Sequence, residues 1–524
     1  MKMVLFAIAS MLLLLGAASA QASRFGQITT VELGDDLRPR VVRLADLDGD
    51  GLDELLIVAE EETVSASRSR RLLVFSGRRG EVAFGQEPTH TLRLTDDVTA
   101  FAWGDVHAAP GQEILLFNGR GVFVWRPEAE GAKRFERLLE ARFLWQLPGF
   151  GGLIDWSDGV RDLDGDGDDD ILIPEPDGYR LALQNRGDEG VTFDATRHLT
   201  VPTPPDDESN RAGGRLQGRS RSRRLQFSIR MGDDSTDGGP WLQVVEGVPA
   251  PQLLDFDGDG DLDVWALTTD ELLVWRQEPR GTWSGSPETH RSPVIINRRR
   301  RFDVAFSSHA LDLDRDGRGD CVFLAGDQRS EDLRAQVLVF LQRPREEDDA
   351  SPLFGPRGVP RQLLVIGGLI GSPRFEDIDG DGSPDLVLTA VQPSLLDRIR
   401  SSGGGRIEAE LYVYLSQRGR LADRPSWTRT IRIPEEGLRQ ARAGVTASFI
   451  GDVTGDGVSE LLLREAAGKV ELKMMRRRDE LMLIEKPLWE MRIDDEARLA
   501  VVERSSGARL LVLEPNRVHH VRWR

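Results

Sequence analysis

The sequence predicts an all-β fold, a seven-bladed β-propeller whose blades have four strands each. An acidic pattern of nine residues occurs seven times, and the starts of successive copies are 59, 57, 93, 57, 65 and 75 residues apart. Each copy runs directly into a short apolar stretch, as residues 162–170 run into residues 171–173. Self-similarity at such a period indicates a repeat architecture, and four-stranded sheets repeated around an axis form a propeller.

The stretches between the acidic copies predict the other strands of each blade. The apolar strand after a copy is followed by a second strand that often ends in an aromatic residue, as residues 72–75 end in Phe75. An alternating strand such as residues 89–94 comes next, and a further strand such as residues 40–44 precedes the acidic copy. Helical periodicity is almost absent. A wholly apolar strand fits a position that is buried on both faces between neighbouring blades.

The number of blades depends on the C-terminal tail. Residues 498–502, 509–513 and 518–523 predict three further strands, and no acidic copy accompanies them. They either complete the last blade and latch against an N-terminal strand around residues 27–33, or they form a degenerate eighth blade. Seven acidic copies favour seven blades, with eight as the alternative.

The acidic copies predict calcium sites. We number them acidic loops 1 to 7: residues 46–54, 105–113, 162–170, 255–263, 312–320, 377–385 and 452–460. Carboxylates packed so closely repel one another unless a hard cation lies among them, and Ca²⁺ takes six to eight oxygen ligands at about 2.3–2.6 Å. The sequence therefore predicts about five to six Ca²⁺ ions, each bracing a turn between two strands of its blade.

Six of the seven loops carry a full set of candidate ligands at their first, third, fifth and ninth positions. These are Asp46, Asp48, Asp50 and Glu54; Asp162, Asp164, Asp166 and Asp170; Asp255, Asp257, Asp259 and Asp263; Asp312, Asp314, Asp316 and Asp320; Asp377, Asp379, Asp381 and Asp385; and Asp452, Thr454, Asp456 and Glu460. Thr454 offers a hydroxyl oxygen in place of a carboxylate. Acidic loop 2 has His107 and Ala109 at the third and fifth positions, which puts a metal there in doubt.

These loops resemble the FG-GAP/VCBS repeat family, whose best-known members form the β-propeller head of integrin α subunits. The resemblance covers nearly all of the chain after residue 20. Seven copies that each run into a strand rather than a helix distinguish it from EF-hands. The family's Phe-Gly dipeptide precedes some outer strands, as at residues 84–85 and 354–355, but not those of every repeat. The resemblance implies a calcium-binding propeller that binds a protein or a glycan.

The N-terminus predicts export. Residues 1–20 contain Lys2, an apolar core at residues 4–16 and a small-residue cleavage site at residues 18–20, which is the pattern of a secretory signal peptide. We expect a periplasmic or extracellular protein, monomeric and without a membrane span, whose propeller occupies residues 21–524. The single cysteine, Cys321, excludes an intramolecular disulfide and is expected to be a buried, inert thiol.

The composition restricts the partners. The formal net charge is −19, and much of this acidity lies in the acidic loops. This balance argues against nucleic acid as a main partner. Insertions break the repeat at about residues 202–240 and 393–407, and the first is rich in arginine at residues 219–224. A second arginine cluster lies at residues 298–301. These basic clusters are either binding sites for anionic glycans or solvated loops.

No familiar catalytic motif occurs in the sequence, and the seven histidines are scattered. The expected function is a non-enzymatic adhesion module, secreted and braced by calcium, that binds an extracellular or envelope protein or glycan. One alternative is a polysaccharide lyase or hydrolase. The other is a structural component of a cell-envelope assembly. The fold alone does not decide among the three.

Overall fold

The computed structural model describes residues 26–61, 69–80, 82–107, 110–127, 134–143, 154–187, 190–202, 226–230, 241–245, 249, 251–267, 271–278, 281–294, 304–327, 334–344, 353–370, 373–391, 406–434, 447–465, 468–494, 496–502 and 507–523. The predicted signal peptide and both arginine clusters lie outside these residues. So do most of the two predicted insertions.

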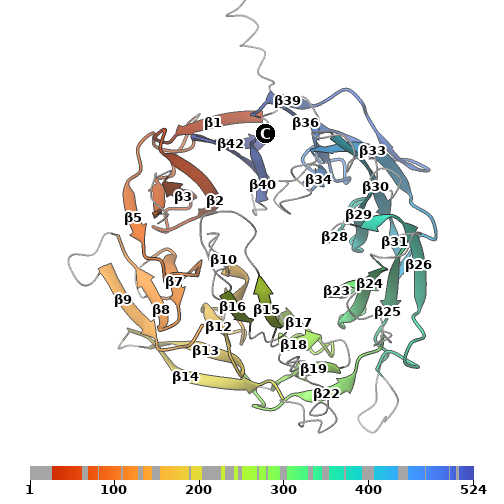
Figure 1. Cartoon of the computed structure of the whole chain (residues 1–524), viewed down its shortest axis with the longest axis horizontal. Helices are drawn as coiled ribbons and strands as arrows, with labels where there is room; N and C mark the ends of the chain where they lie inside the picture. The colour runs from red at the N-terminus through yellow and green to blue at the C-terminus, as the bar shows by residue number, and fades with distance from the viewer. Residues whose placement is uncertain are drawn as a thin grey trace, which may run out of the picture.

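The described strands form eight antiparallel sheets arranged in a ring (Figure 1). Blade 1 consists of β2(Leu37–Ala45), β3(Glu54–Glu61), β4(Arg70–Phe75) and β5(His90–Leu94), and blade 2 of β6(Ala100–Gly104), β7(Glu113–Asn118), β8(Gly121–Trp125) and β9(Phe135–Leu139), with β10(Ile154–Asp155) parallel to β6. Blade 3 consists of β11(Val160–Arg161), β12(Asp170–Glu175), β13(Gly178–Gly187) and β14(Gly190–Thr200). Blade 4 consists of β17(Pro251–Leu254), β18(Asp263–Leu267), β19(Glu271–Trp275) and β22(Glu288–Arg291).

Blades 5 to 8 complete the ring. Blade 5 consists of β23(Val304–Leu311), β24(Asp320–Asp327), β25(Arg334–Phe340) and β26(Gln362–Gly367), and blade 6 of β27(Leu369–Ile370) and β28(Arg374–Glu376), which both pair with β29(Asp385–Val391), followed by β30(Arg406–Tyr414) and β33(Trp427–Pro434). Blade 7 consists of β34(Ala447–Phe449), β35(Leu461–Glu465), β36(Lys469–Lys473) and β39(Trp489–Arg492). Blade 8 consists of β40(Arg498–Val502), β41(Arg509–Glu514), β42(Arg517–Trp523) and β1(Gly26–Glu32).

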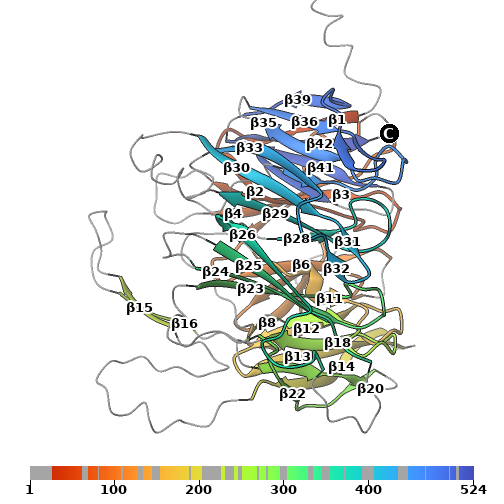
Figure 2. The ribbon, with the colours of Figure 1, turned by 90° about the vertical axis from the view of Figure 1, so that its right-hand side faces the viewer.

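Small additions decorate the blades. A short 3-10 turn, η2(Ser157–Gly159), precedes β11. Four two-strand hairpins are β15(Gln226–Arg230) with β16(Trp241–Val245), β20(Gln277–Glu278) with β21(Thr282–Trp283), β31(Ser416–Gln417) with β32(Arg420–Leu421), and β37(Met475–Arg477) with β38(Leu481–Leu483). Figure 2 shows β15 and β16 projecting from one side of the ring, with β31 and β32 at the other side.

The expectation of seven blades was wrong, and the eight-blade alternative is what the structure shows. The three tail strands do not complete blade 7, because β34, β35, β36 and β39 already form a four-stranded sheet. The tail and the N-terminal strand together form the eighth blade. Strand β1 pairs with β42 in antiparallel register from Gly26 opposite Trp523 to Glu32 opposite Arg517, and this pairing closes the ring.

The apolar core lies between the blades. Among the described residues there are eight buried apolar clusters, and each one joins two neighbouring blades. The strand after an acidic loop serves two of them at once. In β12, Ile171 and Ile173 face the cluster shared with blade 2, whereas Leu172 faces the cluster shared with blade 4. Successive side chains of a strand point to opposite faces, so a strand buried on both faces must be apolar throughout.

Cys321 opens one of these double-faced strands. Its side chain is fully buried in the core between blades 4 and 5, and burial raises the pKa of the thiol well above its ordinary value. This burial confirms the expected location. Within the described residues, no helix is long and apolar enough to cross a membrane.

Histidines at the ring closure predict a pH effect on stability. Strand β42 places His519 opposite Thr30 and His520 opposite Thr29 of β1. His519 Nδ1 lies 2.8 Å from Thr30 Oγ1, and the buried His520 ring packs edge-on against Phe84. Burial, together with the charges of Arg509 and Arg522, lowers the pKa of His520 to about 4.

We therefore expect acid to weaken the closure. The pKa of His520 is lower in the folded state than the ordinary value of 6.5, so the unfolded chain takes up this proton more readily. The stability is fully present above about pH 6.5 and falls toward pH 4, by about 3 kcal/mol in total. Urea unfolding between pH 7.5 and 4.5 should show a shallower loss for His520→Gln than for the unchanged protein. Parallel curves would contradict the assignment.

Candidate functional site

The acidic loops occupy equivalent places in the blades. In blades 1 to 7 each loop joins the innermost strand to the second strand, and its ninth residue begins that second strand or directly precedes it. Because the same connection is used each time, all seven loops lie at the same face of the ring. Blade 8 makes the equivalent connection, between β40 and β41, without an acidic loop.

The first aspartate organises its loop through backbone hydrogen bonds. In acidic loop 3 the two carboxylate oxygens of Asp162 accept hydrogen bonds from Gly165 N at 2.7 Å and Gly167 N at 3.0 Å. Both glycines have left-handed backbones, with φ of 81° and 92°, which a side chain would disfavour. The bond to the sixth residue recurs in the other acidic loops with a full ligand set, at 2.8–3.0 Å.

This turn brings carboxylates together. In several loops three carboxylates form a convergent triad, with oxygens within 4.8 Å of one another. Such triads include three made of the first, third and fifth positions and one, in acidic loop 3, made of the first, third and ninth. The members are Asp46, Asp48 and Asp50; Asp255, Asp257 and Asp259; Asp312, Asp314 and Asp316; and Asp162, Asp164 and Asp170. Such an all-oxygen set suits a hard divalent cation.

One orphaned oxygen supports this fit. Asp257 Oδ2 contacts the guanidinium of Arg276, but the buried Asp257 Oδ1 has no hydrogen-bond partner within the described part of the chain. Leaving a buried charged oxygen unpaired is costly, and a cation at the centre of the loop would remove that cost. The donor set of acidic loop 4 therefore fits a metal ion.

The ninth position has a different task from the first. Asp170 is fully buried, and its oxygens accept hydrogen bonds from Leu163 N at 2.9 Å and Gln184 N at 2.7 Å. The first donor belongs to the loop, and the second belongs to the neighbouring strand of the blade. The same pair of bonds recurs at Glu54, Asp263, Asp320 and Asp385. The ninth acid is thus a latch between loop and sheet, a role that the sequence pattern did not reveal.

Burial perturbs the latch carboxyls. It raises the pKa of Asp170, Asp263, Asp320, Asp385 and Glu460 to about 7; hydrogen bonds from the backbone oppose this shift, and nearby loop acids add to it. Burial likewise raises the pKa of Asp164, Asp314 and Asp379 at third positions. A cation bound in the loop would favour the ionised forms and act in the opposite direction.

Acidic loop 2 has arginine contacts at its first and third positions. Glu113 keeps the latch bond to Val106 N, at 3.1 Å. Asp105, however, forms an ion pair with Arg186 at 2.8 Å, and His107 Nε2 lies 2.5 Å from an Arg126 nitrogen. The side chains of Asp105 and His107 in this loop are therefore paired with arginines rather than drawn together. This arrangement agrees with the doubt that the sequence raised about a metal in this loop.

Acidic loops 6 and 7 also depart from the simple pattern. In loop 6, Asp379 pairs with Arg477, which lies on the β37–β38 hairpin of the next blade. In loop 7, Thr454 Oγ1 donates a hydrogen bond to Glu460 Oε1 at 3.0 Å, so the hydroxyl supports the latch acid. Asp452 keeps its bonds to the loop backbone, including Gly455 N at 2.6 Å.

The eighth position links neighbouring loops, and sequence reasoning missed this. Gln112 N donates to Asp46 O at 3.1 Å, Gly319 N to Phe256 O at 3.4 Å, and Ser459 N to Ile378 O at 2.8 Å. Each bond joins one loop to the loop before it. Pro384, at the eighth position of loop 6, has no N–H, and here Arg315 donates to Asp381 O at 2.7 Å instead. In the sequence, Pro384 was the one sign that the backbone N–H of the eighth position has a structural role.

Comparisons with known proteins agree with the fold. The FG-GAP-like repeat family matches residues 255–323, which contain acidic loops 4 and 5. With the propeller architecture, this match confirms the resemblance to FG-GAP repeat propellers. A search of curated proteins finds no match.

Solved structures give distant similarities. One is titled as the recognition of non-reducing terminal N-acetylglucosamine by an Agrocybe aegerita lectin. It has 16% identity and a TM-score of 0.37, and the match covers 87% of this chain and 93% of the other. The second is the V. cholerae biofilm matrix protein Bap1, with 12% identity, a TM-score of 0.35 and coverage of 95% and 87%.

The latch role predicts a stability effect that does not need metal. Asp320→Asn turns an amide NH₂ toward Leu313 N or Gln342 N and leaves one buried donor without an acceptor, which costs about 1–3 kcal/mol. Asp316→Asn, in the same loop but exposed, should change stability by less than about 0.5 kcal/mol. Urea unfolding in excess EDTA at pH 6, where the carboxyl of Asp320 is largely neutral because burial raises its pKa to about 7, measures both without the cost of burying a charge. Equal effects of the two substitutions would refute the latch.

Proposed function

We propose that this protein is an exported, calcium-braced β-propeller that binds an extracellular or envelope protein or glycan without altering it chemically. The convergence of carboxylate oxygens in repeated loops at one face carries the calcium part of the proposal. The signal-peptide pattern of residues 1–20 supports export, into compartments where calcium is abundant. FG-GAP propellers are commonly binding or adhesion modules, which supports the binding part.

The residues toward the metal divide into two groups. The acids at the first, third and fifth positions would hold the ion, joined in acidic loop 3 by Asp170 of the ninth position, and the ninth acid would also keep the loop attached to its strand. Bound Ca²⁺ supplies a fixed positive charge that joins the acids of the turn. Acidic loop 2 is excluded because it has no acid at its third and fifth positions and its first acid, Asp105, pairs with Arg186, which leaves loops 1, 3, 4, 5, 6 and 7 as candidates.

Bracing by calcium should be large. A site occupied at one hundred times its Kd adds about 2.7 kcal/mol to the stability of the folded state. Five such sites would together exceed 10 kcal/mol, which is comparable with the whole stability of an ordinary domain. The eighth-position bonds would share this gain between neighbouring loops.

Calcium removal should lower the melting temperature of the purified protein by more than 10 °C, because several ions would be lost at once. Differential scanning calorimetry with excess EGTA and with 2 mM CaCl₂ measures the difference. As matched variants, Asp162→Asn should remove one ion from the calcium stoichiometry, and Asp105→Asn in loop 2 should remove none. An unchanged melt in EGTA would reject calcium bracing.

Calcium affinity should fall as the pH falls. In the metal-free protein, burial raises the pKa of five ninth-position acids to about 7, so at and below that pH protonation removes negative charge that favours Ca²⁺ in the loop. We expect the average Kd from isothermal titration calorimetry to be about tenfold weaker at pH 6 than at pH 8. A constant Kd would mean that the loop acids titrate near their ordinary pKa, around 4.

The binding part needs a test that also detects catalysis. The calcium-loaded protein is incubated with a panel of acidic and neutral polysaccharides and scored for retention and for chain length. Retention without shortening supports a binding module. Chain cleavage would replace the proposal with a lyase or hydrolase.

A further inference from the structure

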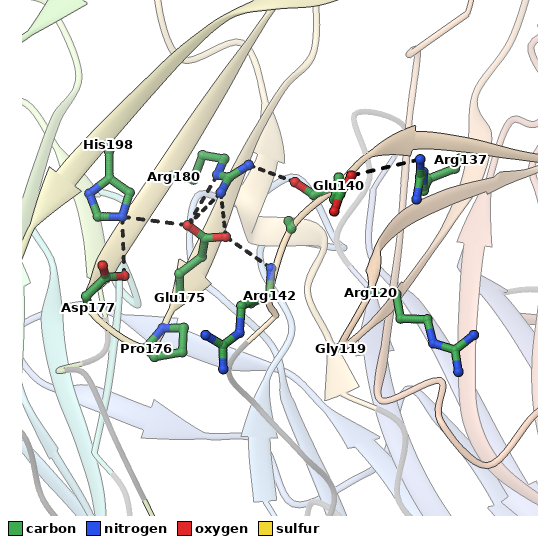
Figure 3. Close-up of a pocket in the computed structure, with 11 residues that line it drawn as sticks. Gly119, Arg120, Arg137, Glu140, Arg142, Glu175, Pro176, Asp177, Arg180 and His198 are labelled. Carbon is green, nitrogen blue, oxygen red and sulfur yellow. Dashed lines mark hydrogen bonds and ion pairs between the residues drawn. The ribbon is translucent and has the colours of Figure 1, made fainter.

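A pocket of about 970 Å³ lies between blades 2 and 3 (Figure 3). It is lined by the turn between β7 and β8, the end of β9 with the residues after it, the turn between β12 and β13, and one residue of β14. Strand β12 begins at the acidic-loop face with Asp170 and ends at Glu175. The pocket therefore lies at the other face of the ring, away from every acidic loop.

The floor of the pocket is fixed by Glu175. This carboxylate is buried and accepts a hydrogen bond from Arg142 N at 3.0 Å, and Arg180 forms an ion pair with it at 2.9 Å. Arg180 also donates to Glu140 O at 2.7 Å. His198 Nε2 lies 3.6 Å from Glu175 and 3.3 Å from Asp177. These contacts tie blade 2 to blade 3 and hold the lining in place.

Two arginines of the lining are left over. The exposed guanidinium groups of Arg120 and Arg142 form no ion pair with any residue that the structure describes. A third, Arg137, is 3.9 Å from Glu140, and both of these side chains are largely exposed. Figure 3 shows Arg120 and Arg142 extending below the paired groups of Glu175 and Glu140. Unpaired guanidinium groups beside a neutralised carboxylate favour an anionic ligand.

A metal ion fits this place less well. Oxygen and nitrogen atoms of Glu175, Asp177 and His198 come within 4.8 Å of one another, as metal ligands would. Arg180 already supplies the positive charge at Glu175 and contacts both oxygens of that carboxylate, and Arg142 N donates a hydrogen bond to Oε1. A cation would have to displace the Arg180–Glu175 ion pair of blade 3, whose two members also make the hydrogen bonds to blade 2.

We propose that this pocket binds the carboxylate or sulfate group of an acidic saccharide, with Arg120 and Arg142 as the anion contacts. The inference rests on the proposed binding function and names its ligand class. Guanidinium groups pair with planar carboxylates through two parallel hydrogen bonds. Asp177 and Glu140 can accept hydrogen bonds from sugar hydroxyls. The lining has only Ala141 and Pro176 as apolar side chains, so it lacks the apolar anchor sites that peptides occupy.

The test uses the calcium-loaded full-length mature protein and short oligosaccharides of equal length. The probes are a hyaluronan tetrasaccharide, a chondroitin sulfate tetrasaccharide and neutral chitotetraose, titrated calorimetrically at 50 and 200 mM NaCl. We expect an acidic probe to bind and the neutral one to bind at least tenfold more weakly. Raising the salt concentration should weaken the binding of the acidic probe, because exposed charges are screened.

The variant Arg120→Gln/Arg142→Gln should bind the acidic probe at least tenfold more weakly than the unchanged protein. The matched control is Arg93→Gln/Arg291→Gln, which removes two exposed arginines without ion pairs to described residues, from the outer strands of blades 1 and 4. Its affinity should equal that of the unchanged protein, and both variants should keep the same melting temperature.

Two results would overturn the pocket assignment: equal affinities in both double variants, or no acidic probe bound by the unchanged protein. Neither result touches the broader proposal, which fails separately if EGTA leaves the melt unchanged or if a polysaccharide is cleaved. Retention of a neutral polysaccharide alone would overturn the acidic-saccharide assignment and keep the binding module.

Discussion

The structure depends on one packing constraint: the second strand of each blade is buried on both faces. Such a strand cannot be covered within its own blade, because half of its side chains belong to the core of the preceding blade pair and half to that of the following pair. Every blade therefore needs two neighbours, and the only arrangement that supplies them all is a closed ring. The closure falls to β1 and β42, which lie at opposite ends of the chain. The stability of the whole ring therefore depends in part on one pair of strands that are separated by almost the whole chain.

A second constraint comes from placing so many carboxylates at one face. The chain compensates them in two ways that need no ion. Backbone N–H groups bind the first and ninth acids of the loops, and arginines pair with acids of loops 2, 4 and 6. Even so, each convergent triad keeps carboxylate oxygens of three acids within 4.8 Å of one another. The eighth-position bonds join loop 1 to loop 2, loop 4 to loop 5 and loop 6 to loop 7, so these turns are held in pairs rather than singly.

The sequence was sufficient for the repeat unit but not for the ring. The acidic loops mark a strand boundary at a fixed place, so four strands per blade and the double-faced burial of the second strand could be predicted. The eighth blade could not, because it has no acidic loop and one of its strands comes from the opposite terminus. The latch role was hidden for a similar reason. An acid at the ninth position is visible, but its donors, such as Gln184 N, belong to another strand. Arg120, Arg142 and Arg180 come from three separate elements and form no motif.

The two faces of the ring therefore differ in how far their residues are held by structural contacts. Acidic loops occupy one end of the second strands, where latch bonds and inter-loop bonds leave little freedom for a residue to change without disturbing the sheet. Among the described residues, the turns at the other end carry local ties such as that of Glu175 with Arg180. A binding surface needs residues that are free of structural duties and yet held on a rigid frame. The pocket between blades 2 and 3 meets both requirements, because Glu175 fixes its floor while Arg120 and Arg142 remain available to a ligand. Bracing at one face and recognition at the other is the division of labour that this architecture favours.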